Sequence, residues 1–198
     1  METIVNTGNA IALQDEIINE RSRLSSDRMD ISFSELMNLY QSEELIIRPE
    51  YQRLYRWTSK QKTALIESIL LGIPIPPIFV SEDENGIWEL VDGLQRVATF
   101  VSFFGHLTDN VTNLSAQYDE EEEEEENIKL ENKWTLEAGS LLKKLEGFNI
   151  DTLPNKLKVN LKRAVLRVEI LRVKNDMATE LLGRFNWSEN VFHSTPNL

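Results

Sequence analysis

The feature that most constrains the fold of this chain is a change of hydrophobic period at Asp92-Gly93. From Ile87 to Val91 successive side chains alternate between two faces, which is the period of a strand. From Leu94 to Phe104 apolar side chains recur at steps of three and four residues, which places them on one face of a helix. The sequence therefore predicts a buried strand that turns sharply into a helix, with Gly105 as the C-terminal stop.

The turn itself carries chemistry. Asp92 is a favourable N-cap residue, and Gln95 stands three residues later, so the pattern predicts a capping box. A helix that starts after glycine leaves backbone N–H groups unpaired, and an anion can bind there. Arg96 lies in the first turn, where a positive charge opposes the helix dipole. This placement predicts a partner for Arg96, either a buried carboxylate or a bound phosphate.

Composition excludes several classes of protein. The 198 residues suffice for one domain, or one and a half, with a real hydrophobic core, and no apolar run is long enough to cross a bilayer. The N-terminus lacks a secretory pattern, and the chain has no cysteine, which excludes disulfides and thiolate metal sites. A cytoplasmic location without membrane contact fits these features.

The net charge of −12 comes largely from one segment. Eight of the 33 acidic residues form the unbroken run Asp119–Glu126, which leaves 25 acidic against 21 basic residues and a charge near −4. The body is therefore mildly acidic, which argues against a nucleic-acid footprint over the whole surface but allows a local basic site. We interpret residues 107–133 as an acidic disordered insertion, with a phosphate mimic or an interaction tail as the functional alternative.

The remaining patterns predict an α/β (α+β) fold. We expect a small mixed sheet from Leu45–Arg48, Ile78–Ser81, Ile87–Val91 and Val165–Val173, with Asn85-Gly86 as a hairpin turn. Helices are expected at Ala10–Leu24, after the capping boxes that begin at Ser32 and Thr58, over Trp134–Gly147, after Leu153-Pro154 and from Asn175 to Phe185. Ser22–Asp30 reads as a polar connector. The expected organisation is an N-terminal arm over residues 1–30, a core over 31–106, the insertion, and helices with one strand over 134–198.

Two motifs resemble a known family. The segment Tyr51-Gln-Arg-Leu-Tyr-Arg-Trp57, followed by Val91-Asp-Gly-Leu-Gln-Arg-Val-Ala-Thr99, looks like the N-terminal domain of GmrSD-type restriction endonucleases. The resemblance covers residues 31 to 186. It implies a fold similar to the ParB/sulfiredoxin-like superfamily, in which the helix start after a strand holds nucleotide phosphates. It also implies a part in prokaryotic or phage restriction and defence.

The resemblance carries over residue by residue. Matching positions are Gln52, Arg53, Tyr55, Trp57, Asp92, Gly93, Gln95, Arg96, Thr99, Arg184 and Asn186. Leu94 departs from the family's usual glutamine, and Trp187-Ser188 stands where the family has two glycines. Larger members continue into a nuclease domain, so we expect this chain not to cut DNA by itself. Hydrolysis stays open, because Leu94 removes a polar side chain from the turn.

The chemistry of the residues gives each candidate a role. Arg53 and Arg96 suit phosphate, since a guanidinium fork matches phosphate oxygens and stays charged. Gly93 allows close backbone approach, and Gln95 can orient a phosphate oxygen or a water. Asp92 can cap the helix, orient Arg96 or hold Mg²⁺ beside a triphosphate.

A purely structural alternative stands beside this one. Asp92 with Arg53 or Arg96 could form a satisfied ion pair that joins the loop to the helix. Tyr51, Tyr55 and Trp57 could anchor the loop rather than stack on a base, and Arg184 could only interact with a helix end.

The resulting hypothesis is a regulatory module that binds a nucleoside triphosphate with Mg²⁺, with nucleoside triphosphatase activity left open. The candidate catalytic residues are Asp92, Gln95 and Arg96, and Asp92 is the candidate metal ligand. The candidate nucleotide-binding residues are Gln52, Arg53, Gly93, Arg96, Thr99, Arg184 and Asn186. A separate nuclease subunit and DNA are candidate partners. The alternative is a non-catalytic DNA-sensing or protein-interaction module on the same scaffold; the sequence leaves the base and the oligomeric state open.

Overall fold

The centre of the molecule is a five-stranded mixed sheet in the order β1-β5-β3-β4-β2. A computed structural model describes residues 7–47, 55–108 and 131–173. The strands are β1 (Leu24–Ser32), β2 (Leu45–Ile46), β3 (Ile78–Glu82), β4 (Trp88–Asp92) and β5 (Val165–Val173). The helices are α1 (Thr7–Arg23), α2 (Phe33–Gln41), α4 (Ser59–Leu71), α5 (Leu94–Phe103) and α7 (Asn155–Arg163). The predicted α/β class is confirmed.

The predicted hairpin is present. β3 and β4 pair antiparallel, and Asp83 closes the turn between them. Its Oδ1 accepts hydrogen bonds from the backbone N–H groups of Asn85 (2.9 Å) and Ile87 (2.8 Å). These bonds hold the pKa of Asp83 below its ordinary value, because they favour the ionised carboxylate. The hairpin fixes where β4 ends, and therefore where α5 begins.

The interpretation of Ser22–Asp30 as a connector is wrong. Leu24–Ser32 is a strand, β1, that pairs antiparallel with the whole of β5. Cross-strand ion pairs substitute for apolar patterning here: Arg28 contacts Glu169 at 3.2 Å, and Arg167 contacts Asp30 at 3.2 Å. Polar alternation on an edge strand resembles a loop in sequence, which explains the error.

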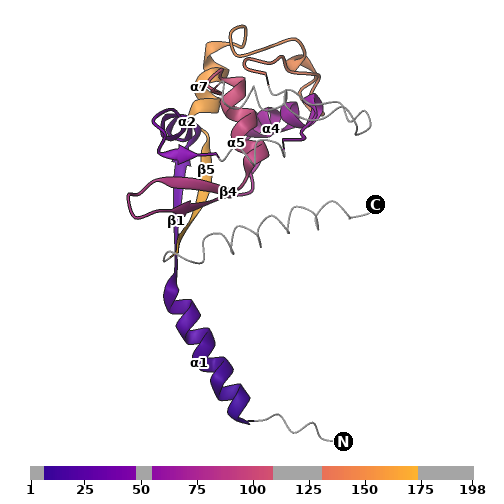
Figure 1. Cartoon of the computed structure of the whole chain (residues 1–198). Helices are drawn as coiled ribbons and strands as arrows, with labels where there is room; N and C mark the ends of the chain where they lie inside the picture. Colours follow the sequence, from indigo (N-terminus) through magenta and orange to yellow (C-terminus); the bar gives the residue numbers. More distant parts are fainter. Residues whose placement is uncertain (1–6, 48–54, 109–130, 174–198) are drawn as a thin grey trace, which may run out of the picture.

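The helices bury one core against the sheet, and Figure 1 shows α2, α4, α5 and α7 gathered together while α1 projects away. Residues Val97–Phe103 of α5 are all buried, which makes α5 the central helix. Two predicted caps are confirmed: Ser32 accepts from the N–H of Glu35, and Thr58 forms a full capping box with Gln61. Gly72, with φ of 70°, ends α4 as predicted.

The predicted helix over Trp134–Gly147 is wrong. This segment is irregular apart from a short 3-10 turn at Lys143–Leu145, and it is held by side chains of other elements. Glu67 of α4 accepts hydrogen bonds from the backbone N–H groups of Ser140 (3.1 Å) and Leu141 (2.8 Å), and Trp134 Nε1 donates to Ser102 Oγ at 3.1 Å. The leucines at positions 141, 142 and 145 mimic a helix period that these contacts override.

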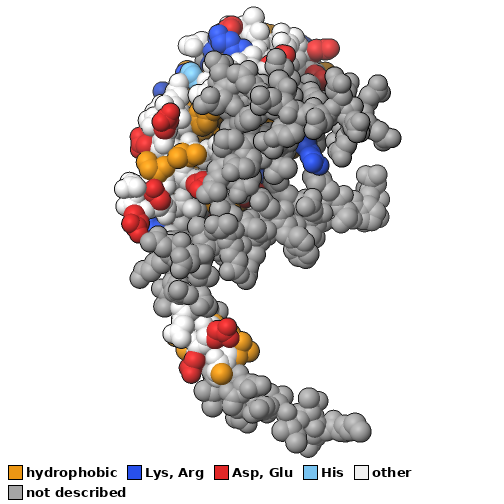
Figure 2. Space-filling view, in the orientation of Figure 1, with side chains coloured by type: hydrophobic (Ala, Val, Ile, Leu, Met, Phe, Trp, Pro, Cys, Tyr) orange, Lys and Arg blue, Asp and Glu red, His pale blue; other side chains and the backbone are white. Residues whose placement is uncertain are grey.

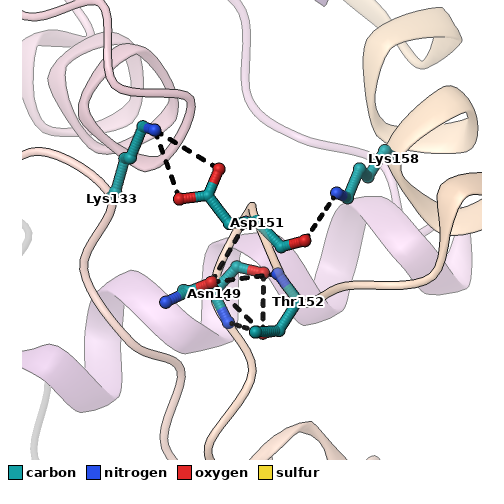
Figure 3. Close-up of polar contacts among 5 residues, drawn as sticks. All are labelled: Lys133, Asn149, Asp151, Thr152 and Lys158. Atoms are coloured by element: carbon teal, nitrogen blue, oxygen red, sulfur yellow. Dashed lines mark hydrogen bonds and ion pairs between the residues drawn. The ribbon is translucent and has the colours of Figure 1, made fainter.

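The turn that leads into α7 is held by a small polar cluster. Asp151 lies between two lysines in Figure 3: its carboxylate receives Lys133 Nζ at 3.2 Å, and its carbonyl oxygen receives Lys158 Nζ at 3.0 Å. Asn149 Oδ1 accepts from the backbone N–H of Asp151 and of Thr152. Helix α7 then begins at Asn155 directly after Pro154, close to the predicted start.

Helix α1 begins near the predicted position and forms an arm. Leu13 and Ile18 are 55% and 64% exposed, and Figure 2 shows apolar side chains on the surface of the arm. In the described part of the chain, no helix is long and apolar enough to cross a membrane. The predicted acidic insertion and the helix Asn175–Phe185 fall mainly or wholly outside the described residues.

Candidate functional site

The candidate site is the junction between β4 and α5, where Gly93 is a structural necessity. Its φ is 100°, in the left-handed region that glycine adopts without strain. A Cβ at this position would lie 2.5 Å from Ile78 Cγ2 and 3.1 Å from Arg96 Nη2. Backbone conformation and close packing against β3 therefore both require glycine. These two structural reasons account for glycine at position 93 even when no ligand is bound. The predicted role of Gly93, to allow close approach of a ligand, is separate from them.

The predicted capping box at Asp92 and Gln95 is wrong. The N-cap residue is Gly93 itself, and it makes no side-chain cap hydrogen bond. Asp92 instead belongs to the end of β4, and its carboxylate turns toward Arg96. The first-turn N–H groups of α5 are thus left without a side-chain cap from the N-cap residue, which suits an anion at this helix start.

Arg96 joins three elements. Its Nη2 donates to Asp92 Oδ2 at 3.0 Å and to the carbonyl oxygen of Pro77 at 3.1 Å. The side chains of Arg96 and Asp92 are 17% and 21% exposed, so the pair is mostly shielded from solvent but reachable. Arg96 Nε is buried and has no hydrogen-bond partner within the described residues. The predicted carboxylate partner of Arg96 is therefore present, and the guanidinium retains unused donor capacity.

Gln95 connects the helix start to the segment Tyr51–Trp57, called the aromatic loop below, of which residues 55–57 are described. Its Oε1 accepts hydrogen bonds from the backbone N–H groups of Arg56 at 3.2 Å and Trp57 at 3.3 Å. One side chain thus holds two consecutive amides of a loop that lies 38 residues or more away in sequence. The acceptor oxygen of Gln95 is engaged in positioning this loop.

A second contact fixes the same loop one turn further along α5. The hydroxyls of Tyr55 and Thr99 lie 2.8 Å apart, and both residues are buried. Burial raises the pKa of Tyr55, so its hydroxyl is protonated and available for this bond. Thr99 has no exposed surface. Tyr55 is therefore a core anchor, as in the structural alternative, and Thr99 fixes the loop through its hydrogen bond to the Tyr55 hydroxyl.

The described residues bring together five of the nine distinct candidate positions. Asp92, Gly93, Gln95, Arg96 and Thr99 lie on the β4–α5 junction. The other four, Gln52, Arg53, Arg184 and Asn186, lie outside the described residues. Within the part of the chain that is described, no group of three or more His, Asp or Glu side chains could hold a metal by itself.

Two kinds of backbone group were missed by sequence reasoning. The carbonyl of Pro77 accepts from Arg96, and the backbone amides of Arg56 and Trp57 donate to Gln95. A signal for the first exists in the run Ile73–Pro77, since consecutive prolines remove donors and leave carbonyls to other partners. Backbone amides carry no such signal, because any residue type supplies them.

The comparison with protein families identifies the family of this chain. The family model of the GmrSD restriction endonuclease, N-terminal domain, matches residues 33–188, which include the whole β4–α5 junction and the aromatic loop. The chain belongs to this family and is therefore a component of a restriction-type defence system. Among curated proteins and solved structures no match is found, so the likeness to the ParB/sulfiredoxin-like superfamily stays a prediction.

Proposed function

We propose that this domain binds a nucleoside triphosphate with Mg²⁺ at the start of α5, as the regulatory module of a restriction-type system. The observation that carries the proposal is the meeting of Arg96 and the aromatic loop at a helix start whose N-cap residue is Gly93, which has no side chain to cap it. The N-terminal end of a helix, its dipole and a guanidinium favour the same ligand class, a phosphate group.

The tether at Tyr55 supports a part for Gln52 and Arg53. Tyr55 and Gln95 fix the loop against α5, and Arg53 precedes Tyr55 by only two residues. Two residues span no more than about 7.6 Å between Cα atoms. Arg53 lies outside the described residues, and the proposal includes it as a second phosphate-binding fork because it is this near to Tyr55 in sequence.

The bonding of Arg96 supports a ligand-dependent change. A buried donor without an acceptor, such as Arg96 Nε, destabilises a structure by about 1–3 kcal/mol. A phosphate oxygen beside the guanidinium would recover this loss if the side chain turned toward it. Asp92 would then release one N–H of Arg96 Nη2, while the other N–H of Nη2 kept its bond to the Pro77 carbonyl.

Mg²⁺ fits this arrangement through Asp92. Nucleotide-bound Mg²⁺ usually takes one or two protein carboxylates, and the phosphates and water complete its six ligands. Asp92 offers one partly exposed carboxylate beside the proposed phosphate position. A bound cation would also relieve the repulsion between this carboxylate and the triphosphate. Arg184 and Asn186 remain proposed contacts from the C-terminal segment.

Calorimetric titration tests the proposal. Wild type is titrated with ATP, GTP, CTP and UTP in Mg²⁺, and heat from at least one nucleotide is expected. Arg96→Ala should weaken that binding at least about tenfold, and Arg96→Lys should recover it only in part because an ammonium lacks the fork. The matched control is Arg167→Ala on β5, which removes an arginine that forms an ion pair with Asp30 of β1. No heat with any nucleotide, or equal losses for Arg96→Ala and Arg167→Ala, would overturn the proposal.

Binding without turnover is a second candidate, and Gln95 favours it. Its acceptor oxygen is engaged by the Arg56 and Trp57 amides, and the neighbouring Leu94 packs against the core rather than offering a polar group. The turn thus has few groups free to orient an attacking water. Phosphate release measured at saturating nucleotide separates the two: turnover above the uncatalysed rate excludes the binding-only module.

A further inference from the structure

The described sheet has two unequal edges. At one edge, β2 is only two residues long. At the other, β1 runs for nine residues and pairs with β5 in an unbroken register from Leu24 to Ser32. Its sequence contains no proline, and its pairing contains no bulge, which are common means of blocking an edge. A long, straight edge presents backbone N–H and C=O groups to another strand.

The side chains of β1 divide between two faces. Met29 stands opposite Val168, which is fully buried, and Ile31 on the same face is 7% exposed. On the other face, Arg28 stands opposite Glu169 and Asp30 opposite Arg167, each pair bridged at 3.2 Å. Met29 itself is 46% exposed although it continues an apolar row. The face that carries Met29 and Ile31 is therefore apolar at these two positions and charged at Asp27, which Arg172 of β5 contacts at 3.4 Å. The other face is charged at Arg28 and Asp30.

We propose that β1 is a self-association surface, along which a second copy of this chain pairs antiparallel about a two-fold axis at Met29. An axis normal to the sheet places residues of the same face opposite each other. With Met29 on the axis, Arg28 of each copy stands opposite Asp30 of the other. The charged face then continues as Glu169, Arg28, the second copy's Asp30 and its Arg167, with alternating sign across four strands.

Three neighbouring registers are unfavourable because they place like charges opposite each other. An axis at Asp27 or Asp30 places two carboxylates opposite each other, and an axis at Arg28 places two guanidinium groups opposite each other. Like charges directly opposite destabilise strand pairing. Met29 gives instead an apolar contact in line with Val168 of each copy. Charge complementarity therefore selects both the partner and the register.

This register also gives the exposed apolar side chains of the arm, α1, a surface to pack on. Ser26 stands opposite Ser32 of the second copy, so α1, which ends at Arg23, lies next to the start of the second copy's α2. In this dimer the second copy is the surface on which the apolar side chains that α1 exposes, including Leu13 and Ile18, would pack. The strand edge and the arm form one continuous interface.

Sedimentation equilibrium tests the association. Wild type is expected at twice the 22.9 kDa of one chain. Met29→Lys places two like charges at the axis and should weaken association at least about tenfold. The matched control is Ile46→Lys on the opposite edge of the sheet, where the replaced side chain is similarly exposed, at 43%; it should leave the mass unchanged. A single-chain mass at the highest soluble concentration, or a dimer that Met29→Lys leaves intact, would overturn the proposal.

Disulfide trapping tests the register. The chain has no cysteine, so a single introduced thiol can form a disulfide only with the same residue of a second copy. Met29→Cys should give a covalent dimer on oxidation, because residues opposite each other at the axis lie within disulfide reach. Ser25→Cys, on the same strand and face but four residues away, should not. Equal trapping at both positions, or trapping at Ser25→Cys alone, would contradict the register.

Discussion

Two carboxylates, Glu67 and Asp92, each follow two apolar residues in the sequence, but they differ in burial and in the number of hydrogen bonds that they accept. Glu67 on α4 is 3% exposed, and its two oxygens receive four hydrogen bonds: three from the backbone N–H groups of residues 140–142 and one from the hydroxyl of Ser140. Asp92 is 21% exposed and receives one hydrogen bond from Arg96. Glu67 belongs to neither motif, whereas Asp92 stands at the centre of one.

The difference in hydrogen bonding distinguishes a carboxylate that holds the fold together from one that can exchange partners with a ligand. Glu67 has its acceptor capacity filled by one segment, and even Gly139 is required there because a Cβ would collide with its carboxylate. Asp92 and Arg96 are held more loosely, and Arg96 Nε has no acceptor in the described residues. A site that must exchange partners with a ligand needs such spare capacity. A carboxylate that organises a long irregular segment needs the opposite.

Removing the Glu67 carboxylate should have the largest effect on stability. Glu67→Ala leaves three backbone N–H groups and a hydroxyl without their acceptor, and each buried group of this kind costs about 1–3 kcal/mol. We expect a loss of about 4 kcal/mol in the free energy of unfolding, measured by urea denaturation. Glu67→Gln, which keeps one acceptor oxygen, should lose roughly half of that. A loss below about 1 kcal/mol for Glu67→Ala would remove the contrast with Asp92.

The same carboxylate should dominate acid sensitivity. Its hydrogen bonds lower the pKa of Glu67 from 4.5 to about 2, chiefly through the N–H of Leu142. A carboxyl whose pKa is lower in the folded state stabilises the fold above its unfolded pKa, and this contribution disappears as the pH falls through the folded pKa. Wild type should therefore lose stability between about pH 5 and pH 2. Glu67→Gln should show a flatter profile; parallel profiles would contradict this assignment.

The fold was predictable where a local pattern and its tertiary role agree. The Asn85-Gly86 hairpin, the caps at Ser32 and Thr58, and the β4–α5 turn were all predicted, because turn and cap chemistry act over three or four residues. β1 was missed because cross-strand charges, not apolar alternation, hold it to β5. The segment 134–147 was mistaken for a helix because its anchor, Glu67, lies 73 to 75 residues away in sequence.

The position of the β4–α5 junction was predictable from the sequence, but its hydrogen bonds were not. The motif indicated Asp92, Gln95 and Arg96, and the structure places all three on one junction. It did not indicate that Gln95 holds loop amides or that Arg96 reaches the Pro77 carbonyl. Backbone acceptors and donors are the same for every residue type, so only the path of the chain reveals them.

The Tyr55–Thr99 bond should have an intermediate effect. Tyr55→Phe leaves the buried Thr99 hydroxyl without its partner at 2.8 Å, and we expect a loss of about 1–2 kcal/mol in the free energy of unfolding. Thr99→Val should cost a similar amount. The double variant should lose less than the sum, because two apolar groups replace a satisfied pair. Full additivity would show that the two hydroxyls act independently and that the loop is not tethered at this point.

The smallest stability effect is expected at Asp92, together with the clearest effect on binding. The Asp92–Arg96 pair is partly exposed, so Asp92→Asn should change the free energy of unfolding by less than about 1 kcal/mol. In the proposed site the same variant removes the Mg²⁺ ligand, so nucleotide affinity should lose its dependence on Mg²⁺. Titration of wild type and Asp92→Asn with and without Mg²⁺ measures this, with Asp151→Asn, whose carboxylate is exposed in the turn before α7, as the control for charge. If Asp92→Asn unfolds the protein as readily as Glu67→Ala does, Asp92 is architectural like Glu67, and the distinction between the two carboxylates fails.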